Sequence, residues 1–214
     1  KKTDYSKGVA IGSILHIGEH SHLEPVRYSK GSGFWRLIML PRVEGKSFIV
    51  RFYKIIADFI KHPINNFKTI FVDDWAQRTQ VLLFMQTLDS TLNFSERSFG
   101  LGMKTGLEEG KAPTPFIPEA QSMAEKYAEK MDGKPMMPNN EALFGIPTTA
   151  HILGGACMGK NINEGVIDKN NYVFGYENML VCDGSMISAN PGVNPSLTIT
   201  ALTERAMSFI PNAL

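Results

Sequence analysis

The chain has 214 residues and a formal net charge of +1, from 22 Lys and Arg against 21 Asp and Glu. This length accommodates one large domain or two small ones, and a hydrophobic fraction of 43% supports a core and argues against disorder. A charge so close to zero removes the electrostatic argument for binding nucleic acid or an acidic membrane surface. The two cysteines, Cys157 and Cys182, form neither a disulfide framework nor a Cys-x-x-Cys metal pair, which fits a cytoplasmic protein.

The chain shows no segment typical of targeting or of membrane insertion. Residues 1–7 are polar and do not resemble a secretory signal. The longest apolar stretch, Ser47 to Ile60, is interrupted by three charged residues. We therefore expect no stable insertion into a bilayer.

The first two thirds of the chain predict a mixture of strands and helices. A β-branched apolar run predicts a strand over Gly8 to Ile17, and Leu23 to Arg36, with Pro25, reads as irregular. Apolar residues at helical spacing predict an amphipathic helix over Ser47 to Lys61, which is a candidate lid or a packing element. Ala76 to Leu88 is ambiguous between helix and strand, and its apolar run Val81 to Met85 is short enough for a buried strand.

Further along, the pattern predicts a strand over Asn93 to Met103 and a helix over Pro118 to Met131. Gly165 to Val173 has the pattern of a hairpin, and Met179 to Cys182 that of a short strand. Together these elements predict an α+β fold with a mixed or antiparallel sheet and helices.

The last predicted helix has the clearest start in the sequence. Asn194 is a good N-cap and Pro195 suits the first helical position, where its missing N–H costs nothing. The free N–H groups at such an end attract negative charge, whether permanent or developing. An ordinary capped surface helix has the same pattern.

Two more segments contain residue types that chemistry uses. His151 precedes the Gly154-Gly155 pair, so its imidazole is a candidate for proton exchange beside a ligand, or for a hydrogen bond at a glycine turn. Asp183-Gly184-Ser185 follows a predicted strand, where nucleotide-binding folds place their ligands, although the tripeptide is also a common turn.

Two other kinds of site are disfavoured. His16, His20 and His22 have a spacing compatible with zinc, but no cysteine completes the set, and solvated turn histidines are the simpler reading. His151, Asp183 and Ser185 are the residue types of a hydrolase triad, but the sequence contains no G-x-S-x-G elbow. We therefore predict neither a metal centre nor a serine hydrolase.

Read in order, the C-terminal motifs resemble those of the glucose-methanol-choline (GMC) flavin oxidoreductases, and the bacterial cholesterol oxidase branch most of all. The matching motifs are His151-x-Leu153-Gly154-Gly155, Gly165-Val166-Ile167-Asp168, Val173-Phe174-Gly175-Tyr176, Val181-Cys182-Asp183-Gly184-Ser185 and Gly192 to Arg205. The stretches Leu23 to Tyr28 and Arg78 to Asp89 also resemble this branch.

The resemblance implies oxidation of an alcohol by FAD, with a sterol or another bulky apolar alcohol as substrate. It implies that His151 and Asn194 are catalytic at the substrate hydroxyl. It also implies that Asp183 and Gly184 contact the ribityl and pyrophosphate part of FAD. The helix start formed by Asn194, Pro195 and Ser196 would face the flavin ring, where negative charge develops on reduction.

This sequence departs from the family pattern in two ways. The family's G-x-G-x-x-G fingerprint does not occur, so we expect a C-terminal portion that is inactive and binds FAD weakly when alone, with self-association through exposed apolar surface. Some cholesterol oxidases also use a glutamate on a substrate-domain strand as an additional base. The comparable stretch here is near Asp74 to Gln80, where Arg78 or Thr79 falls at that position, so this base is unassigned.

The predicted organisation is a substrate-binding domain over residues 1–145 and the C-terminal part of an FAD-binding α/β domain over residues 146–214. The alternative function is a non-catalytic binding module that retains the fold but not the chemistry. The missing fingerprint and the unassigned glutamate are the features that favour it.

Overall fold

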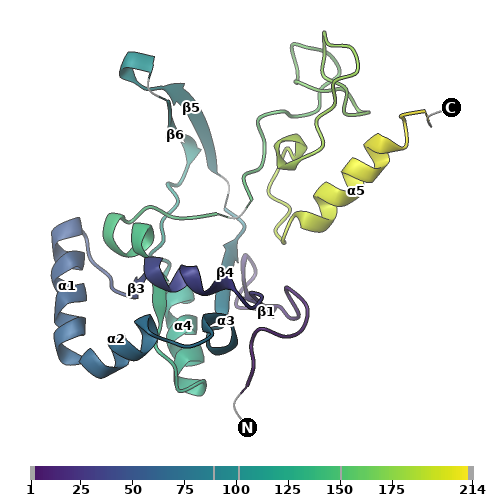
Figure 1. The fold of residues 1–214 in the computed structure, drawn as a ribbon. Helices are drawn as coiled ribbons and strands as arrows, with labels where there is room; N and C mark the ends of the chain where they lie inside the picture. Colours follow the sequence, from purple (N-terminus) through teal and green to yellow (C-terminus); the bar gives the residue numbers. More distant parts are fainter. Residues whose placement is uncertain (1–2, 89, 101, 150, 212–214) are drawn as a thin grey trace. The chain divides into compact units, whose positions relative to one another are not determined.

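The computed structural model describes residues 3–88, 90–100, 102–149 and 151–211. It forms two compact units, one of residues 1–86 and 90–148 and one of residues 87–89 and 149–214, and each is described by itself (Figure 1). Asp89, at the end of the stretch that resembles cholesterol oxidases, lies outside the described residues. The observed class is α+β with small antiparallel sheets. The assignment of residues 1–145 to substrate and of residues 146–214 to FAD stays a prediction.

The first unit contains a three-stranded antiparallel sheet in the order β1-β2-β4. Its strands are β1 (Leu15–His16), β2 (Ser21–Val26) and β4 (Val81–Gln86). The predicted strand at Val81 to Met85 is confirmed, but the irregular reading from Leu23 is wrong. Pro25 is tolerated in β2 because β1 pairs only with His22 and Leu23, so no N–H is needed there toward β1.

The predicted strand over Gly8 to Ile17 is wrong for most of its length. Only β1 and one bridge from Ile11 to Val26 are paired. Gly8 has a φ of 106°, which a continuous strand does not allow. The 3-10 helix η1 (Ser32–Ile38) follows β2, and β3 (Met39–Pro41) then pairs with β7 (Met136–Pro138).

The amphipathic helix predicted from Ser47 is confirmed as α1 (Phe48–Lys61). The Ser47 hydroxyl accepts a hydrogen bond from the Val50 N–H and caps the helix. One face is buried through Ile55, which packs with Met137 and Ala142, the latter in the short π-helix η3 (Asn140–Phe144). The sequence pattern therefore located this helix and the face that packs on the core.

The first unit also contains α2 (Pro63–Ile70), α3 (Trp75–Arg78) and α4 (Pro118–Lys130). Pro63 occupies the first turn of α2, and Pro118 that of α4, because a proline costs no hydrogen bond there. The helix predicted over Pro118 to Met131 is thus confirmed. The short helix α3 precedes β4 and buries Trp75.

The predicted single strand over Asn93 to Met103 is instead part of a two-stranded hairpin. The strands are β5 (Ser90–Glu96) and β6 (Met103–Gly110), joined through the 3-10 turn η2 (Ser98–Gly100). The chain reverses at Gly100, whose φ is 67°. Positive φ at a glycine marks a turn rather than a strand interior.

A polar cluster fixes α2 against α1. Asn66 is 1% exposed, and its amide donates to the Asp58 carbonyl (3.1 Å) and to the Asp58 carboxylate (2.9 Å). Lys134 donates to the side-chain oxygen of Asn66 (Oδ1) at 2.6 Å and pairs with the Asp58 carboxylate. The angle between the two helices is therefore held by hydrogen bonds as well as by packing.

This cluster predicts a pH-dependent stability. Partial burial raises the pKa of Asp58, but hydrogen bonds from Lys134 and Asn66 and the Lys134 charge outweigh it, so the pKa lies below its ordinary value. The folded chain thus binds this proton more weakly than the unfolded chain, and the contribution to stability is present above about pH 4 and lost as pH falls further. In urea unfolding of the complete polypeptide, Asp58→Asn should flatten this acid dependence, whereas Glu129→Gln should keep it. Equal acid dependence in wild type and Asp58→Asn would contradict the cluster's role.

The second unit has little regular structure besides α5 (Ser196–Met207) and the 3-10 turn η4 (Gly184–Met186). Its core consists of Ile167, Met186 and Ile187, against which side chains of α5 pack. The predicted helix is confirmed, with a start one residue later than expected. The strands predicted over Gly165 to Val173 and Met179 to Cys182 are wrong as ladders, because only single bridges form there within the described residues.

The reversal between the two predicted hairpin arms is nevertheless real. The Asp168 carboxylate accepts hydrogen bonds from the Asn170 N–H (2.8 Å) and the Tyr172 N–H (3.0 Å). The Asp168 N–H donates to the Tyr172 carbonyl at 2.9 Å. Side-chain hydrogen bonds of this kind stabilise a turn without a following sheet.

Candidate functional site

Backbone hydrogen bonds in the second unit join the segment after His151 to the Asp183-Gly184-Ser185 turn. The Gly154 N–H donates to the Gly184 carbonyl at 3.2 Å, and the Ala156 N–H donates to the Ser185 carbonyl at 2.9 Å. The Thr203 hydroxyl of α5 donates to the Cys182 carbonyl at 2.9 Å. Three segments that the sequence analysis singled out separately therefore lie together.

Gly184 is required by the close approach of these segments. A Cβ atom at this position would lie 2.7 Å from the Ile152 carbonyl oxygen. The backbone carrying His151 therefore passes directly over Gly184, with no room for any other residue. The glycine at position 184 is therefore explained by backbone packing within the second unit.

The N-cap of α5 is Pro195, so the prediction of Asn194 as N-cap is one residue too early, although the Asn194 side chain still binds the first turn. The side-chain oxygen of Asn194 accepts hydrogen bonds from the Ser196 N–H (3.2 Å) and the Ser196 hydroxyl (2.9 Å). In the described part of the chain, the N–H groups of Leu197 and Thr198 have no recorded acceptor, and the first backbone bond of the helix is from Ile199 to Pro195. The helix end thus keeps two free donors and a partial positive charge.

His151 lies at this helix end. Its Nε2 atom is 3.5 Å from the Ser196 hydroxyl oxygen, which in turn bonds to Asn194. The His151 backbone is held by Thr149, whose hydroxyl accepts from the His151 N–H at 3.3 Å. The ring is only half-buried and can exchange a proton with a bound hydroxyl group.

Asp183 presents an ionised carboxylate directly before η4. Hydrogen bonds from the Ser185 hydroxyl (2.5 Å) and the Ser185 N–H (2.8 Å) to one carboxylate oxygen hold the pKa of Asp183 below its ordinary value. The second carboxylate oxygen has no recorded partner among the described residues, and the side chain is exposed. An exposed carboxylate acceptor of this kind suits ligand hydroxyl groups.

Two of the histidines considered for zinc lie on the paired strands β1 and β2. His16 and His22 face each other across β1 and β2, with ring centroids 6.0 Å apart. The residues that the structure describes contain no group of three or more His, Cys, Asp or Glu side chains that could hold a metal ion.

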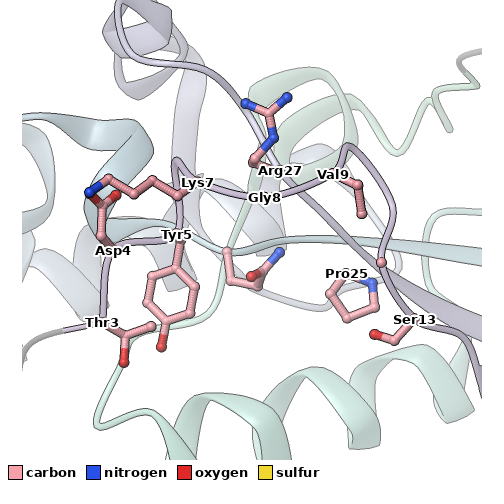
Figure 2. Close-up of a pocket in the computed structure, with 11 residues that line it drawn as sticks. Thr3, Asp4, Tyr5, Lys7, Gly8, Val9, Ser13, Pro25 and Arg27 are labelled. Carbon is pink, nitrogen blue, oxygen red and sulfur yellow. The ribbon is translucent and has the colours of Figure 1, made fainter.

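A depression of about 340 Å³ lies in the first unit, and its lining includes none of the predicted site residues (Figure 2). It is lined by Thr3, Asp4, Tyr5, Lys7, Gly8, Val9, Gly12, Ser13, Pro25, Arg27 and Gln80. Lys7 and Asp4 form an ion pair at 3.7 Å, and Arg27 donates to the Ser6 carbonyl at 3.3 Å. Lys7 and Asp4 thus pair with each other, whereas the buried Nε atom of Arg27 has no hydrogen-bond partner in the described structure.

One titratable pair was missed by the sequence analysis. On β2, His22 and Glu24 are 5% and 4% exposed, and His22 Nε2 lies 3.4 Å from a Glu24 carboxylate oxygen. The other Glu24 oxygen is buried with no hydrogen-bond partner in the described structure. The i, i+2 spacing in a strand, which places both side chains on one face, is the signal that identifies such a pair.

The segments that contain these motifs match a known protein family. A family model described as GMC oxidoreductase matches residues 74–203. This match covers more than half of the chain and includes His151, Asp183 and the start of α5. The chain belongs to the GMC oxidoreductase family.

Two similar proteins match almost the whole length of this chain. The chain is 41% identical to a cholesterol oxidase of Acinetobacter baumannii and 37% identical to one of Mycobacterium tuberculosis, over 99% and 98% of its own length. It spans 38% and 37% of the length of these two relatives. It is also 36% identical to a long-chain-alcohol oxidase of Arabidopsis thaliana over 66 residues, 31% of this chain and 9% of that protein. Within the described residues, no helix has both the length and the apolarity needed to cross a bilayer.

Proposed function

We propose that the chain is part of an FAD-dependent alcohol oxidoreductase, and that His151 and Asn194 act at the substrate hydroxyl. The observation that carries the proposal is the 3.5 Å approach of His151 Nε2 to the Ser196 hydroxyl at the start of α5. A proton-exchanging ring beside a helix end with free N–H donors combines the two functions that alcohol oxidation requires.

The donor set of the second unit fits FAD, the cofactor that GMC oxidoreductases use. We assign the flavin ring to the start of α5 (Asn194, Pro195 and Ser196), where free N–H groups favour an electron-rich edge. We assign the ribityl and pyrophosphate part to the Asp183 carboxylate and to the Gly184 backbone. FAD, when bound, supplies the acceptor for the hydride that leaves the carbinol carbon.

The roles of the protein side chains follow from their hydrogen-bonding capacity. Asn194 uses its side-chain oxygen on Ser196, which leaves its amide N–H groups to donate to the substrate oxygen. The His151 ring accepts the hydroxyl proton as the hydride departs from the carbinol carbon. Loss of both leaves the substrate as a neutral carbonyl compound. Ser196 orients the imidazole.

For the substrate, we propose a sterol or another bulky apolar alcohol. Two relatives that match almost the whole chain are named cholesterol oxidases, and a shorter match is named a long-chain-alcohol oxidase. Both names describe alcohols with large apolar bodies, so the shared substrate class is defined by size and apolarity.

Flavin uptake by the complete polypeptide tests the proposal against the alternative of a non-catalytic binding module. Purified from its complete gene, the protein should carry FAD and show the visible absorbance of oxidised flavin. A colourless protein that takes up no added FAD would support the module instead. Gly184→Ala should lower the FAD content, because its Cβ atom would meet the Ile152 carbonyl at 2.7 Å.

A further inference from the structure

The direction of each hydrogen bond at the start of α5 follows from which groups can donate. The Ser196 backbone N–H can only donate, so the Asn194 side-chain atom that it meets at 3.2 Å is the amide oxygen. An amide oxygen can only accept, so the Ser196 hydroxyl, 2.9 Å from the same oxygen, donates its hydrogen to it. The single hydrogen of the Ser196 hydroxyl is therefore used on Asn194.

The use of this hydrogen determines how Ser196 interacts with His151. The Nε2 atom of His151 lies 3.5 Å from the Ser196 hydroxyl oxygen. Because that hydroxyl has no second hydrogen, it can only accept from the ring, and Nε2 must carry the hydrogen. A neutral imidazole has one N–H group, so Nδ1 keeps a lone pair. The hydrogen bonds therefore select the Nε2–H tautomer of neutral His151.

We propose that Ser196 is a positioning residue that holds His151 in this tautomer, and that Nδ1 is the atom that accepts the hydroxyl proton of the substrate. The recorded hydrogen bonds of His151 to described residues involve its backbone and Nε2 only, which leaves Nδ1 for a ligand. The role of Nδ1 rests on the proposed function of His151, whereas the tautomer follows from hydrogen bonds within the protein.

The proton transfer at Nδ1 leaves the contact with Ser196 intact. The O–H bond of the substrate breaks and an Nδ1–H bond forms, so the ring becomes a cation that still donates from Nε2 to Ser196. The electron pair of the O–H bond forms the carbonyl as hydride leaves the carbinol carbon for FAD. Ser196 therefore orients the ring both before and after the transfer.

The backbone on both sides of the contact between His151 and Ser196 is held in place. The Thr149 hydroxyl accepts from the His151 N–H at 3.3 Å and donates to the His151 carbonyl at 3.1 Å. On α5, the Thr200 hydroxyl donates to the Ser196 carbonyl at 2.9 Å, and Pro195 is fully buried. Rotation of the His151 side chain is therefore the freedom that the Ser196 hydroxyl removes.

Nitrogen NMR of the complete polypeptide, prepared with ¹⁵N-labelled histidine, tests the tautomer without any turnover. The signals of His151 are identified by their loss in His151→Ala. In wild type, at a pH where the ring is neutral, Nε2 should give the signal of a protonated nitrogen and Nδ1 that of an unprotonated one. Ser196→Ala should show a mixture of both tautomers, because it removes the acceptor at Nε2. Ser196→Thr keeps a hydroxyl and should restore the wild-type pattern.

Turnover of the same variants tests the role of Nδ1. At equal flavin content, Ser196→Ala should lower kcat for alcohol oxidation at least about tenfold, because the ring no longer presents Nδ1 in one orientation, and Ser196→Thr should recover most of the loss. Ser208→Ala is the matched control. It removes a hydroxyl that donates to the Arg205 carbonyl at the other end of α5, and should keep both the tautomer and kcat.

The NMR and turnover results distinguish this inference from the proposed function. An Nδ1–H tautomer in wild type, or equal tautomer populations in wild type and Ser196→Ala, would overturn the positioning role of Ser196. So would a wild-type kcat in Ser196→Ala. Wild-type turnover in His151→Ala would instead overturn the proposed function, and with it the role of Nδ1, whatever tautomer NMR detects.

Discussion

Replacement of His151 by alanine is expected to lower kcat for alcohol oxidation in the complete polypeptide by about 10²- to 10⁴-fold, the usual contribution of a positioned proton acceptor. The imidazole lies at the start of α5, with Nε2 3.5 Å from the Ser196 hydroxyl, and no other histidine lies in residues 151–211. Removing the ring leaves the substrate proton without this acceptor. Initial-rate measurements with a sterol and with a long-chain alcohol provide the test.

The controls for His151→Ala separate chemistry from folding. The ring forms no core contact and is only half-buried, so the melting temperature and the flavin content should stay close to those of wild type. His62→Ala removes an exposed histidine from the first unit and should retain wild-type kcat. If His151→Ala retains both kcat and its pH dependence, the histidine has no part in the proton transfer.

Replacement of Gly165 by alanine is expected to destabilise the second unit by at least about 3 kcal/mol, from steric conflict and lost hydrogen bonds. A Cβ atom on Gly165 would lie 2.5 Å from the Gly159 nitrogen and 2.6 Å from the Cys157 carbonyl oxygen. These are backbone atoms and cannot rotate away. Moving the two segments apart would break two backbone hydrogen bonds of 2.9 Å. These run from the Gly159 N–H to the Ile167 carbonyl and from the Val166 N–H to the Cys157 carbonyl.

Urea unfolding of the complete polypeptide, monitored by flavin release and circular dichroism, measures this loss. Gly175→Ala is the matched control in the same unit: its added Cβ atom meets nothing within 4 Å, and only its φ of 79° makes it costly, by about 1 kcal/mol. We expect Gly165→Ala to be clearly less stable than Gly175→Ala. Equal stability of the two variants would show that the Gly159–Gly165 crossing is not tight in the folded protein.

Local signals in the sequence were sufficient for the long helices. α1 begins after a serine cap and repeats apolar residues at helical spacing, and α4 begins at a proline, so both lie within a residue or two of their predicted bounds. The second unit was predicted less well. Its chain reversals are stabilised by side-chain hydrogen bonds, such as those to Asp168, instead of by a ladder of backbone hydrogen bonds. The alternation of apolar residues in the sequence does not distinguish these two cases.

The site was predictable as a set of residues but not as a geometry. Motif order singled out His151, Asp183 and Asn194, whereas the hydrogen bond that links the His151 ring to the start of α5 passes through Ser196 and depends on the tertiary fold. The β2 pair of His22 and Glu24 escaped because Pro25 made the segment look irregular. Burial of two titratable side chains cannot be read from local sequence alone.

The most direct test of the account is anaerobic rapid mixing of the FAD-loaded complete polypeptide with cholesterol and with a long-chain alcohol, following the visible absorbance of oxidised flavin. If His151 and Asn194 act in alcohol oxidation, the flavin bound to wild-type protein should lose this absorbance in a single turnover. In His151→Ala, at equal flavin content, the flavin should lose it at least about 10²-fold more slowly. Persistent flavin absorbance in wild type with every alcohol, or equal rates in wild type and His151→Ala, would contradict the assignment of this site.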